Sequence, residues 1–102
     1  MPKKKHNYHD DLIAELKDPE FAAEYLQAAL EESDMPEVFL RALRNVAEAR
    51  GMTQLARETE LKRESLYTML SERGNPVLSS LYAILDALEL RFSVVRKEKE
   101  AA

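Results

Sequence analysis

The residues best suited to catalysis or metal binding are few. His6 and His9 are the two histidines of the chain, and there is no cysteine. Both histidines lie in a polar N-terminal stretch beside Asp10, so no imidazole is placed to activate a serine in an apolar core. A His-x-x-His pair can hold a metal in principle, but tail histidines without cysteine partners more often bind nothing. No carboxylate lies in an apolar run, where a raised pKa would allow it to act as a general acid. We therefore expect no enzyme, no cofactor and no metal site.

Another group of polar residues has the spacing expected for contact with DNA. In a short helix predicted over about 62–72, Leu66, Met69 and Leu70 form the inward face. The outward arc then consists of Arg63, Glu64, Tyr67, Thr68 and Ser71. In a major groove, Arg can bind guanine O6 and N7, Tyr and Thr can contact a thymine methyl, and Glu can accept from cytosine N4. The alternative is an ordinary solvent-exposed helix face.

Phosphate contacts are expected from polar residues flanking this arc. The candidates are Gln54, Arg57, Lys62 and Arg73. Cationic side chains at such positions hold a protein on the duplex without reading its sequence. Glycine-rich phosphate loops are absent, since the chain contains just Gly51 and Gly74.

Proline, glycine and acidic caps divide the chain into predicted helices. We expect them at about residues 10–17, 19–32, 35–50, 53–60, 62–72 and 78–89. Asp18-Pro19 is typical of a helix start, because the carboxylate accepts a backbone bond and the proline lacks an N–H that would be unpaired. Asp34-Met35-Pro36-Glu37 has the spacing of a capping box. Gly51 suits a left-handed helix end, and Gly74-Asn75-Pro76 stops the fifth helix.

Apolar residues repeat with helical spacing along these segments. The predicted inward positions are Leu12, Ile13, Leu16, Phe21, Tyr25, Leu26, Ala29, Leu30, Phe39, Leu43, Val46, Ala47, Leu55, Ala56, Leu66, Met69, Leu70, Leu78, Leu81, Ile84, Leu85 and Leu88. The pattern predicts an all-α fold. Arg91 to Val95 alternates weakly, so a short C-terminal strand is expected there, although one chain offers it no partner.

Length and charge limit the classes of function. At 102 residues the chain has room for one core. Its apolar runs are too short for a membrane span, and the lack of cysteine fits a reducing cytoplasm. The formal charge of −4 disfavours a generic nucleic-acid binder. Residues 1–36, however, hold 9 acidic and 4 basic residues, so the acidity lies in the first third and the rest is balanced.

The spacing around residue 56 matches a known arrangement. Leu55-Ala56, Leu61 five residues after the alanine and Leu66 ten after it resemble the phage-repressor-like (Xre/Cro) helix-turn-helix family. Ala56 must be small because the two short helices cross there, and Leu66 fixes the second helix so that its other face stands clear of the protein.

Longer stretches resemble a narrower group within that class. They are Leu16-Lys-Asp-Pro-Glu20, Tyr25-Leu-Gln-Ala-Ala-Leu30, Arg50-Gly-Met-Thr-Gln-Leu-Ala-Arg-Glu-Thr59, Arg63-Glu-Ser-Leu-Tyr67, Gly74-Asn-Pro76 and Leu88-Glu-Leu-Arg91. In order and spacing they are similar to the probable addiction-module antidote proteins, antitoxins of bacterial type II toxin–antitoxin pairs. The resemblance implies a cytoplasmic, DNA-binding antitoxin that neutralises a small RelE/ParE-like toxin and represses its own operon.

These observations give a predicted organisation. Residues 1–7 and 97–102 are expected to be disordered tails around a single helix-turn-helix domain over 8–96. That domain divides into an N-terminal helical extension (8–34), a repressor-like core (35–90) and a dimerisation strand (91–96).

Two partner surfaces are expected besides the DNA-reading helix. The acidic first third, represented by Asp11, Glu15, Glu20 and Glu24, is placed to steer a basic toxin, although surface helices are commonly acidic. Leu90, Phe92 and Val94 would form a strand that pairs with a second copy across a two-fold axis, or else a frayed end. Two copies are expected because one supplies too few cations to bind DNA well.

Two residues depart from the wider family's pattern. Glu60 stands at a turn position that favours a left-handed backbone, and Lys62 stands where a serine or threonine usually caps the second helix. Each costs about 1 kcal/mol of local stability. They leave open an alternative function, a protein-interaction module that has lost DNA binding. A second alternative, within the DNA-binding class, is a stand-alone dimeric repressor without a toxin.

Overall fold

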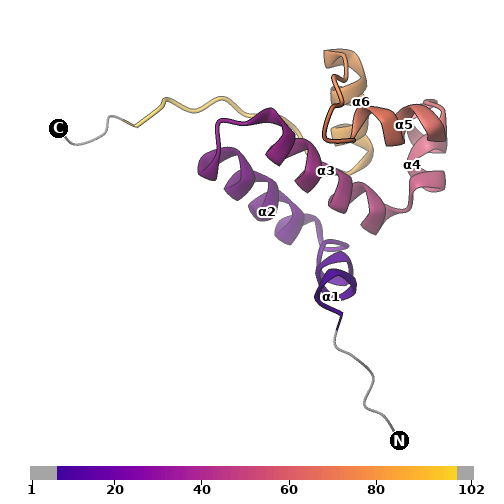
Figure 1. The fold of residues 1–102 in the computed structure, drawn as a ribbon, viewed down its shortest axis with the longest axis horizontal. Helices are drawn as coiled ribbons and strands as arrows, with labels where there is room; N and C mark the ends of the chain where they lie inside the picture. Colours follow the sequence, from indigo (N-terminus) through magenta and orange to yellow (C-terminus); the bar gives the residue numbers. More distant parts are fainter. Residues whose placement is uncertain (1–6, 99–102) are drawn as a thin grey trace, which may run out of the picture.

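Six α-helices make up the regular structure of residues 7–98, the part of the chain that the computed structural model describes (Figure 1). They are α1 (Tyr8–Glu15), α2 (Pro19–Glu32), α3 (Pro36–Arg50), α4 (Met52–Thr59), α5 (Arg63–Met69) and α6 (Leu78–Ala87). The all-α prediction is confirmed. The predicted disordered tails fall largely on residues 1–6 and 99–102, which lie outside the described residues, as does His6. Asn7, assigned above to the first tail, is the N-cap of α1.

Helix starts follow the predicted chemistry at one site and not at another. Asp18 accepts a hydrogen bond from the backbone N–H of Glu20 at 3.1 Å, and Pro19 opens α2 as expected. The capping box before α3 is wrong, because Met35 is the N-cap and no side chain caps this helix. Asp34 stands one residue too early to reach the first turn, and the hydroxyl of Ser33 accepts from the N–H of Met35 at 3.0 Å instead.

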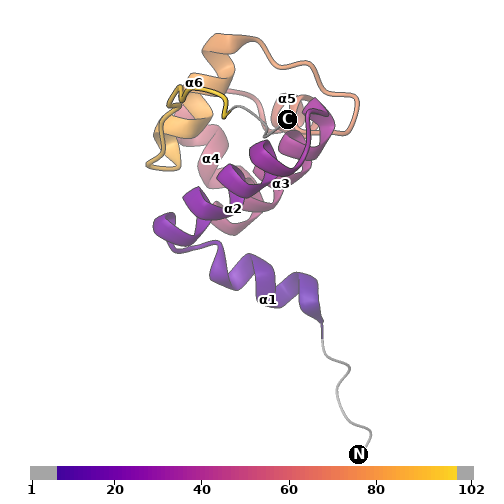
Figure 2. The same ribbon diagram turned by 90° about the vertical axis from the view of Figure 1, so that its left-hand side faces the viewer.

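The helices form two groups that meet on α3. α1 and α2 pack against one part of α3, while α4 packs against α3, α5 and α6 (Figures 1 and 2). The largest fully buried side chains are Leu43, Leu55, Leu66, Leu70 and Ile84, contributed by α3 to α6 and by the residue that follows α5. Burying each leucine or isoleucine contributes about 1.5–3 kcal/mol, so the core holds the short helices α4 and α5 in place.

Most predicted inward positions are buried or half-buried, with two exceptions. Leu78 is 61% exposed because it begins α6, whose first turn projects beyond the neighbouring helices (Figures 1 and 2). Leu30 is 49% exposed in the last turn of α2, beside the turn into α3. Helical periodicity identifies the apolar side of a helix, but it does not show where the neighbouring helix ends.

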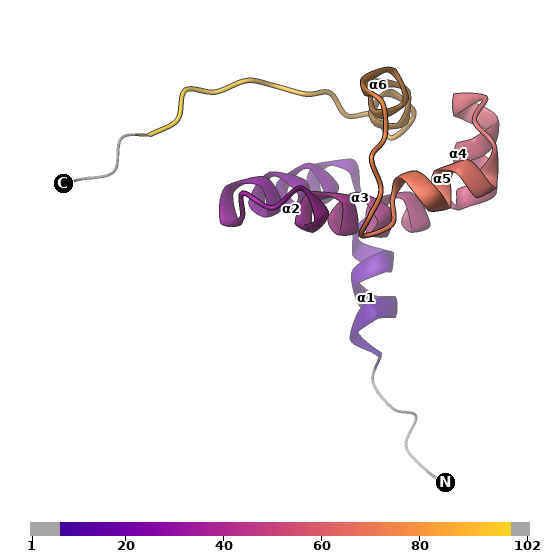
Figure 3. The same cartoon turned by 45° about the horizontal axis from the view of Figure 1, so that its top comes forward.

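The predicted C-terminal strand is absent from the described residues. Residues 91–98 have no regular secondary structure and run away from the helices as an extended arm (Figure 3). Phe92 anchors the start of this arm, with its ring centroid 6.4 Å from that of Phe39 and 5.7 Å from that of Tyr82. Beyond it, Val94 is 96% exposed. A strand needs backbone partners, and a single chain provides none here.

Positive backbone angles occur at two junctions around α4. Gly51 joins α3 to α4 with φ of 97°, as expected for a glycine between helices. Glu60 follows α4 with φ of 61° and ψ of 20°, which confirms the left-handed turn predicted at this position. A residue that carries a Cβ atom adopts this left-handed backbone conformation at a cost of about 1–2 kcal/mol.

An ion pair clamps the junction between α3 and α4. The guanidinium of Arg50 donates from Nε to Glu58 Oε1 at 2.8 Å and from Nη2 to Oε2. This hydrogen bonding lowers the pKa of Glu58 below its ordinary value and raises the pKa of Arg50.

We predict that Glu58→Gln destabilises the protein near neutral pH and not in acid. Because the folded pKa of Glu58 is depressed, its contribution is complete above the ordinary glutamate pKa and is lost as the pH falls through the folded value. Urea unfolding followed by circular dichroism over a pH series measures the difference in unfolding free energy. Glu24→Gln, at an exposed site on α2, is the control. A deficit that persists or grows in acid contradicts the prediction.

We predict that Glu60→Gly stabilises the fold by about 0.5–1 kcal/mol. Glycine removes the left-handed strain, and this gain exceeds the loss that comes from the larger conformational entropy of glycine in the unfolded chain. Glu24→Gly, inside α2, is the matched control and should destabilise by about 1 kcal/mol. Thermal or urea unfolding measures both. Equal losses in the two variants would show that residue 60 is not strained.

Candidate nucleic-acid interface

Two short helices, α4 and α5, present the predicted DNA-reading residues. α5 has only seven residues, too few for a stable isolated helix, so its position depends on packing. Leu66 is fully buried and Leu70 is 1% exposed, which confirms them as the inward face, while Met69 is half-buried. Ala56 on α4 is half-buried against the core. The opposite side of α5 is left to solvent.

The turn between α4 and α5 is held by a threonine that sequence reasoning missed. Thr59 Oγ1 donates to the carbonyl of Leu55 at 2.7 Å and accepts from the N–H of Leu61 at 3.3 Å. It therefore links the last turn of α4 to the residue after Glu60. Lys62 is the N-cap of α5 and makes no side-chain capping bond, as predicted. A hydroxyl directly before a left-handed position was the signal that could have identified this link.

Most of the predicted recognition residues share one helix. Arg63, Glu64 and Thr68 are exposed on α5, and Tyr67 is half-buried. Ser71 lies beyond the end of α5, so it does not continue the helical arc, and its hydroxyl donates to the carbonyl of Thr68 at 2.8 Å. The hydroxyl of Thr68 itself donates to the carbonyl of Glu64 at 3.1 Å. What Thr68 offers outward is therefore its methyl group and an acceptor oxygen.

Tyr67 is held by two arginines. The guanidinium carbon of Arg63 lies 5.7 Å from the centre of the Tyr67 ring, and that of Arg44 on α3 lies 5.5 Å away. Both distances are within the range of a cation–π contact. Arg44 also donates to Glu48 at 3.5 Å. Sequence reasoning missed Arg44, because a residue on α3 carries no spacing signal that relates it to α5.

The predicted phosphate contacts come from three parts of the α4–α5 pair. Gln54 and Arg57 are exposed on α4, Lys62 is exposed at the start of α5, and Arg73 is exposed in the turn that follows it. That turn is tight at Gly74, where a Cβ atom would lie 2.0 Å from the carbonyl oxygen of Met69. Only glycine fits there, so this residue fixes how the chain leaves α5 toward α6.

The other predicted partner residues lie on separate surfaces. Asp11 and Glu15 are exposed on α1, and Glu20 and Glu24 are exposed on α2, at a distance from α5 across α3 (Figure 1). Leu90 is half-buried, whereas Phe92 and Val94 are exposed on the C-terminal arm.

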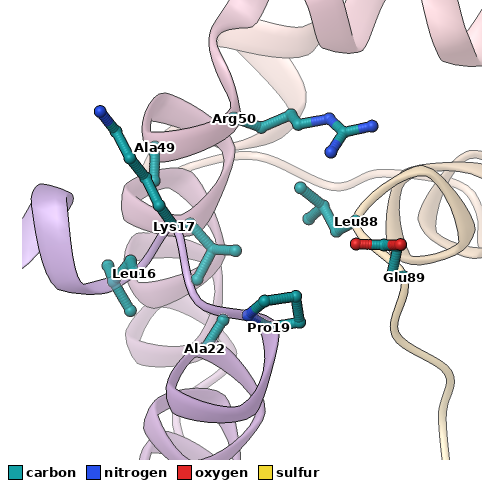
Figure 4. Close-up of a pocket in the computed structure, with 9 residues that line it drawn as sticks. Leu16, Lys17, Pro19, Ala22, Ala49, Arg50, Leu88 and Glu89 are labelled. Atoms are coloured by element: carbon teal, nitrogen blue, oxygen red, sulfur yellow. The ribbon is translucent and has the colours of Figure 1, made fainter.

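A cleft of about 230 Å³ lies between the α1–α2 link, α3 and the end of α6. Figure 4 shows its polar side chains, Lys17, Arg50 and Glu89, around an apolar floor that includes Leu16 and Leu88. The cleft is lined by no serine, threonine, cysteine or histidine. Across residues 7–98 no group of three or more His, Cys, Asp or Glu side chains is arranged to hold a metal ion, and His9 pairs with Glu48 at 3.3 Å. Nor is any helix in this part of the chain long and apolar enough to cross a bilayer.

Comparison with known proteins identifies the family. The family described as "Probable addiction module antidote protein" matches residues 7–96. An uncharacterized protein of Haemophilus influenzae is 38% identical over 84 residues, which cover 82% of this chain and 86% of that protein. No solved structure matches the chain. With nearly its whole length matched, the chain belongs to the family of probable addiction-module antidote proteins.

Proposed function

We propose that this protein is a DNA-binding antitoxin that neutralises a small RelE/ParE-like toxin and, as a homodimer, represses the operon encoding both. The observation that carries the proposal is the exposed polar side of α5, which faces solvent because the leucines on the other side of the helix are buried in the core. The chain also belongs to the antidote family. The arrangement of α4 and α5 supports placing the chain in the phage-repressor-like (Xre/Cro) helix-turn-helix class.

In this proposal α5 enters the major groove. Arg63 lies in its first turn, where a guanidinium can bind guanine O6 and N7 with two hydrogen bonds. Tyr67 packs between Arg63 and Arg44, so its ring is presented to the bases in one orientation. The Thr68 methyl contacts a thymine methyl, and Glu64 accepts from cytosine N4. Gln54, Arg57, Lys62 and Arg73 bind the phosphates on either side.

The toxin contact is proposed for α1 and α2. Their exposed carboxylates include Glu15, Glu20 and Glu24, and residues 1–36 hold nine acidic residues against four basic ones. A ribosome-directed toxin is expected to be basic because its target is RNA, so this surface would speed its association. Because the acidic helices lie at a distance from α5, one copy can hold DNA and toxin at the same time (Figure 1).

We predict that Arg63→Ala weakens binding to the operon's own promoter by about 10- to 100-fold and relaxes the sequence preference at one base pair. Lys17→Ala, a cation lost from the α1–α2 link, should leave binding unchanged. Electrophoretic mobility shift or fluorescence anisotropy at several salt concentrations measures both. If Arg63→Ala and Thr68→Ala bind the promoter like the unmodified protein, α5 is not the recognition helix.

We also predict that the chain co-purifies with the small basic protein encoded beside it when the two are co-expressed. Glu15→Lys combined with Glu24→Lys should slow association with that protein by about tenfold at low salt, with a smaller effect at high salt. Asp86→Lys, a charge reversal on α6, is the control. Stopped-flow or surface plasmon resonance gives the rates. If Glu15→Lys with Glu24→Lys leaves the association rate unchanged, the toxin binds elsewhere on the protein. If the two proteins do not form a complex at all, the result favours a stand-alone repressor.

A further inference from the structure

An apolar groove lies open between the α2–α3 turn and the start of α6. It has a volume of about 390 Å³, and its lining includes Leu30, Met35, Phe39, Pro76 and Leu81. Leu30 is 49% exposed and Met35 is 54% exposed. Exposed apolar side chains gathered in one groove are unfavourable in water and mark a surface that another chain covers.

The α2–α3 segment that forms one side of this groove is acidic, and it is called the acidic rim below. Residues 31–37 carry four carboxylates and no cation: Glu31, Glu32, Asp34 and Glu37. Asp34 lines the groove itself, and Glu31 and Glu32 are exposed at the end of α2. A segment that fits here must combine apolar side chains with positive charge.

The C-terminal arm, residues 91–98, has this composition. Val94 is 96% exposed and Val95 is 73% exposed. They are flanked by Arg91 on one side and by Arg96 and Lys97 on the other, with Glu98 as the single acidic residue of the arm. The arm has no hydrogen-bonded secondary structure of its own, so its backbone can adapt to a groove.

We propose that the arm of one copy occupies the groove of a second copy, and that the exchange is reciprocal. The occupant of the groove is thus residues 91–97 of another molecule of this chain. Val94 and Val95 cover Leu30 and Met35, while Arg96 and Lys97 meet the acidic rim. The inference deepens the proposed function and rests on it, because that function needs two copies to hold DNA.

Arm and groove are neighbours on one surface, which is what a two-fold dimer requires. Phe92, at the base of the arm, packs against Phe39, which lines the groove. A two-fold axis passing near Phe92 would therefore join both arm–groove contacts into one continuous interface. The arm does not cover its own groove, since Val94 and Leu30 both stay exposed in the single chain.

Cysteine cross-linking tests this geometry, because the chain contains no cysteine of its own. Val94→Cys and Met35→Cys are purified separately, mixed and oxidised, so that any bond between positions 94 and 35 joins two molecules. We expect a covalent heterodimer from this mixture. Ala14→Cys, exposed on α1, replaces Met35→Cys in the control mixture and should give little of it.

Charge reversal gives a second measurement. Arg96→Glu with Lys97→Glu should raise the dimer dissociation constant at least about tenfold in sedimentation velocity. Glu31→Lys with Asp34→Lys, mixed with that variant, should restore association through the arm–groove pairs that regain opposite charges. Asp10→Lys on α1 is the control reversal and should leave the dissociation constant unchanged.

Four outcomes would overturn the proposal. They are a monomer at every concentration, no bond between positions 94 and 35 in the mixture, cross-linking between two Val94→Cys arms alone, and no response to the charge swap. The first outcome also counts against repression by a homodimer, whereas the other three leave the proposed function separately testable. Promoter binding and toxin co-purification depend on α5, α1 and α2, so they can succeed while the arm exchange fails.

Discussion

Burial of Leu66 and Leu70 is the interaction on which the candidate site depends. α5 is too short to be stable alone, and its N-cap residue, Lys62, supplies no side-chain bond, so packing on α4 and on the core must compensate. That packing also fixes the rotation of the helix. Once the two leucines face inward, Arg63 and Thr68 must face outward, and the polar surface follows from the apolar one. A cavity at Leu66 would therefore disturb the surface proposed for DNA contact as well as lower the stability of the fold.

The helices could be predicted because their starts and stops are local. Asp18 and Pro19 fix the start of α2. Gly51 and Gly74 mark turns that favour glycine, the first because its φ is positive and the second because a Cβ atom would meet the backbone of Met69. The inward leucines of α5 could be predicted for a similar reason, since spacing alone determines which side of a short helix they share. Even the strained turn at Glu60 was predictable, because the position and not the residue type sets its conformation.

The remaining features depend on distances between elements that are far apart in sequence. Arg44 reaches Tyr67 from another helix, and nothing in the local pattern around either residue indicates that contact. Leu30 and Leu78 have the periodicity of core residues, yet each lies near a helix end where no neighbour covers it. The prediction of a strand after Leu90 was wrong for a related reason, since strand pairing depends on a partner backbone that the single chain lacks.

Charge pairing within the described residues limits the cations that this chain of net −4 has left for the proposed DNA contact. Arg41, Arg44 and Arg50 are engaged by Glu72, Glu48 and Glu58, so these arginines are already neutralised. The cations proposed for the duplex are Arg57, Lys62, Arg63 and Arg73. About four phosphate or base contacts per copy give a modest, salt-sensitive affinity, because each phosphate neutralised contributes through counterion release. The proposed repression would then require a second copy, and the geometry that joins two copies would set the spacing of the half-sites that α5 can reach.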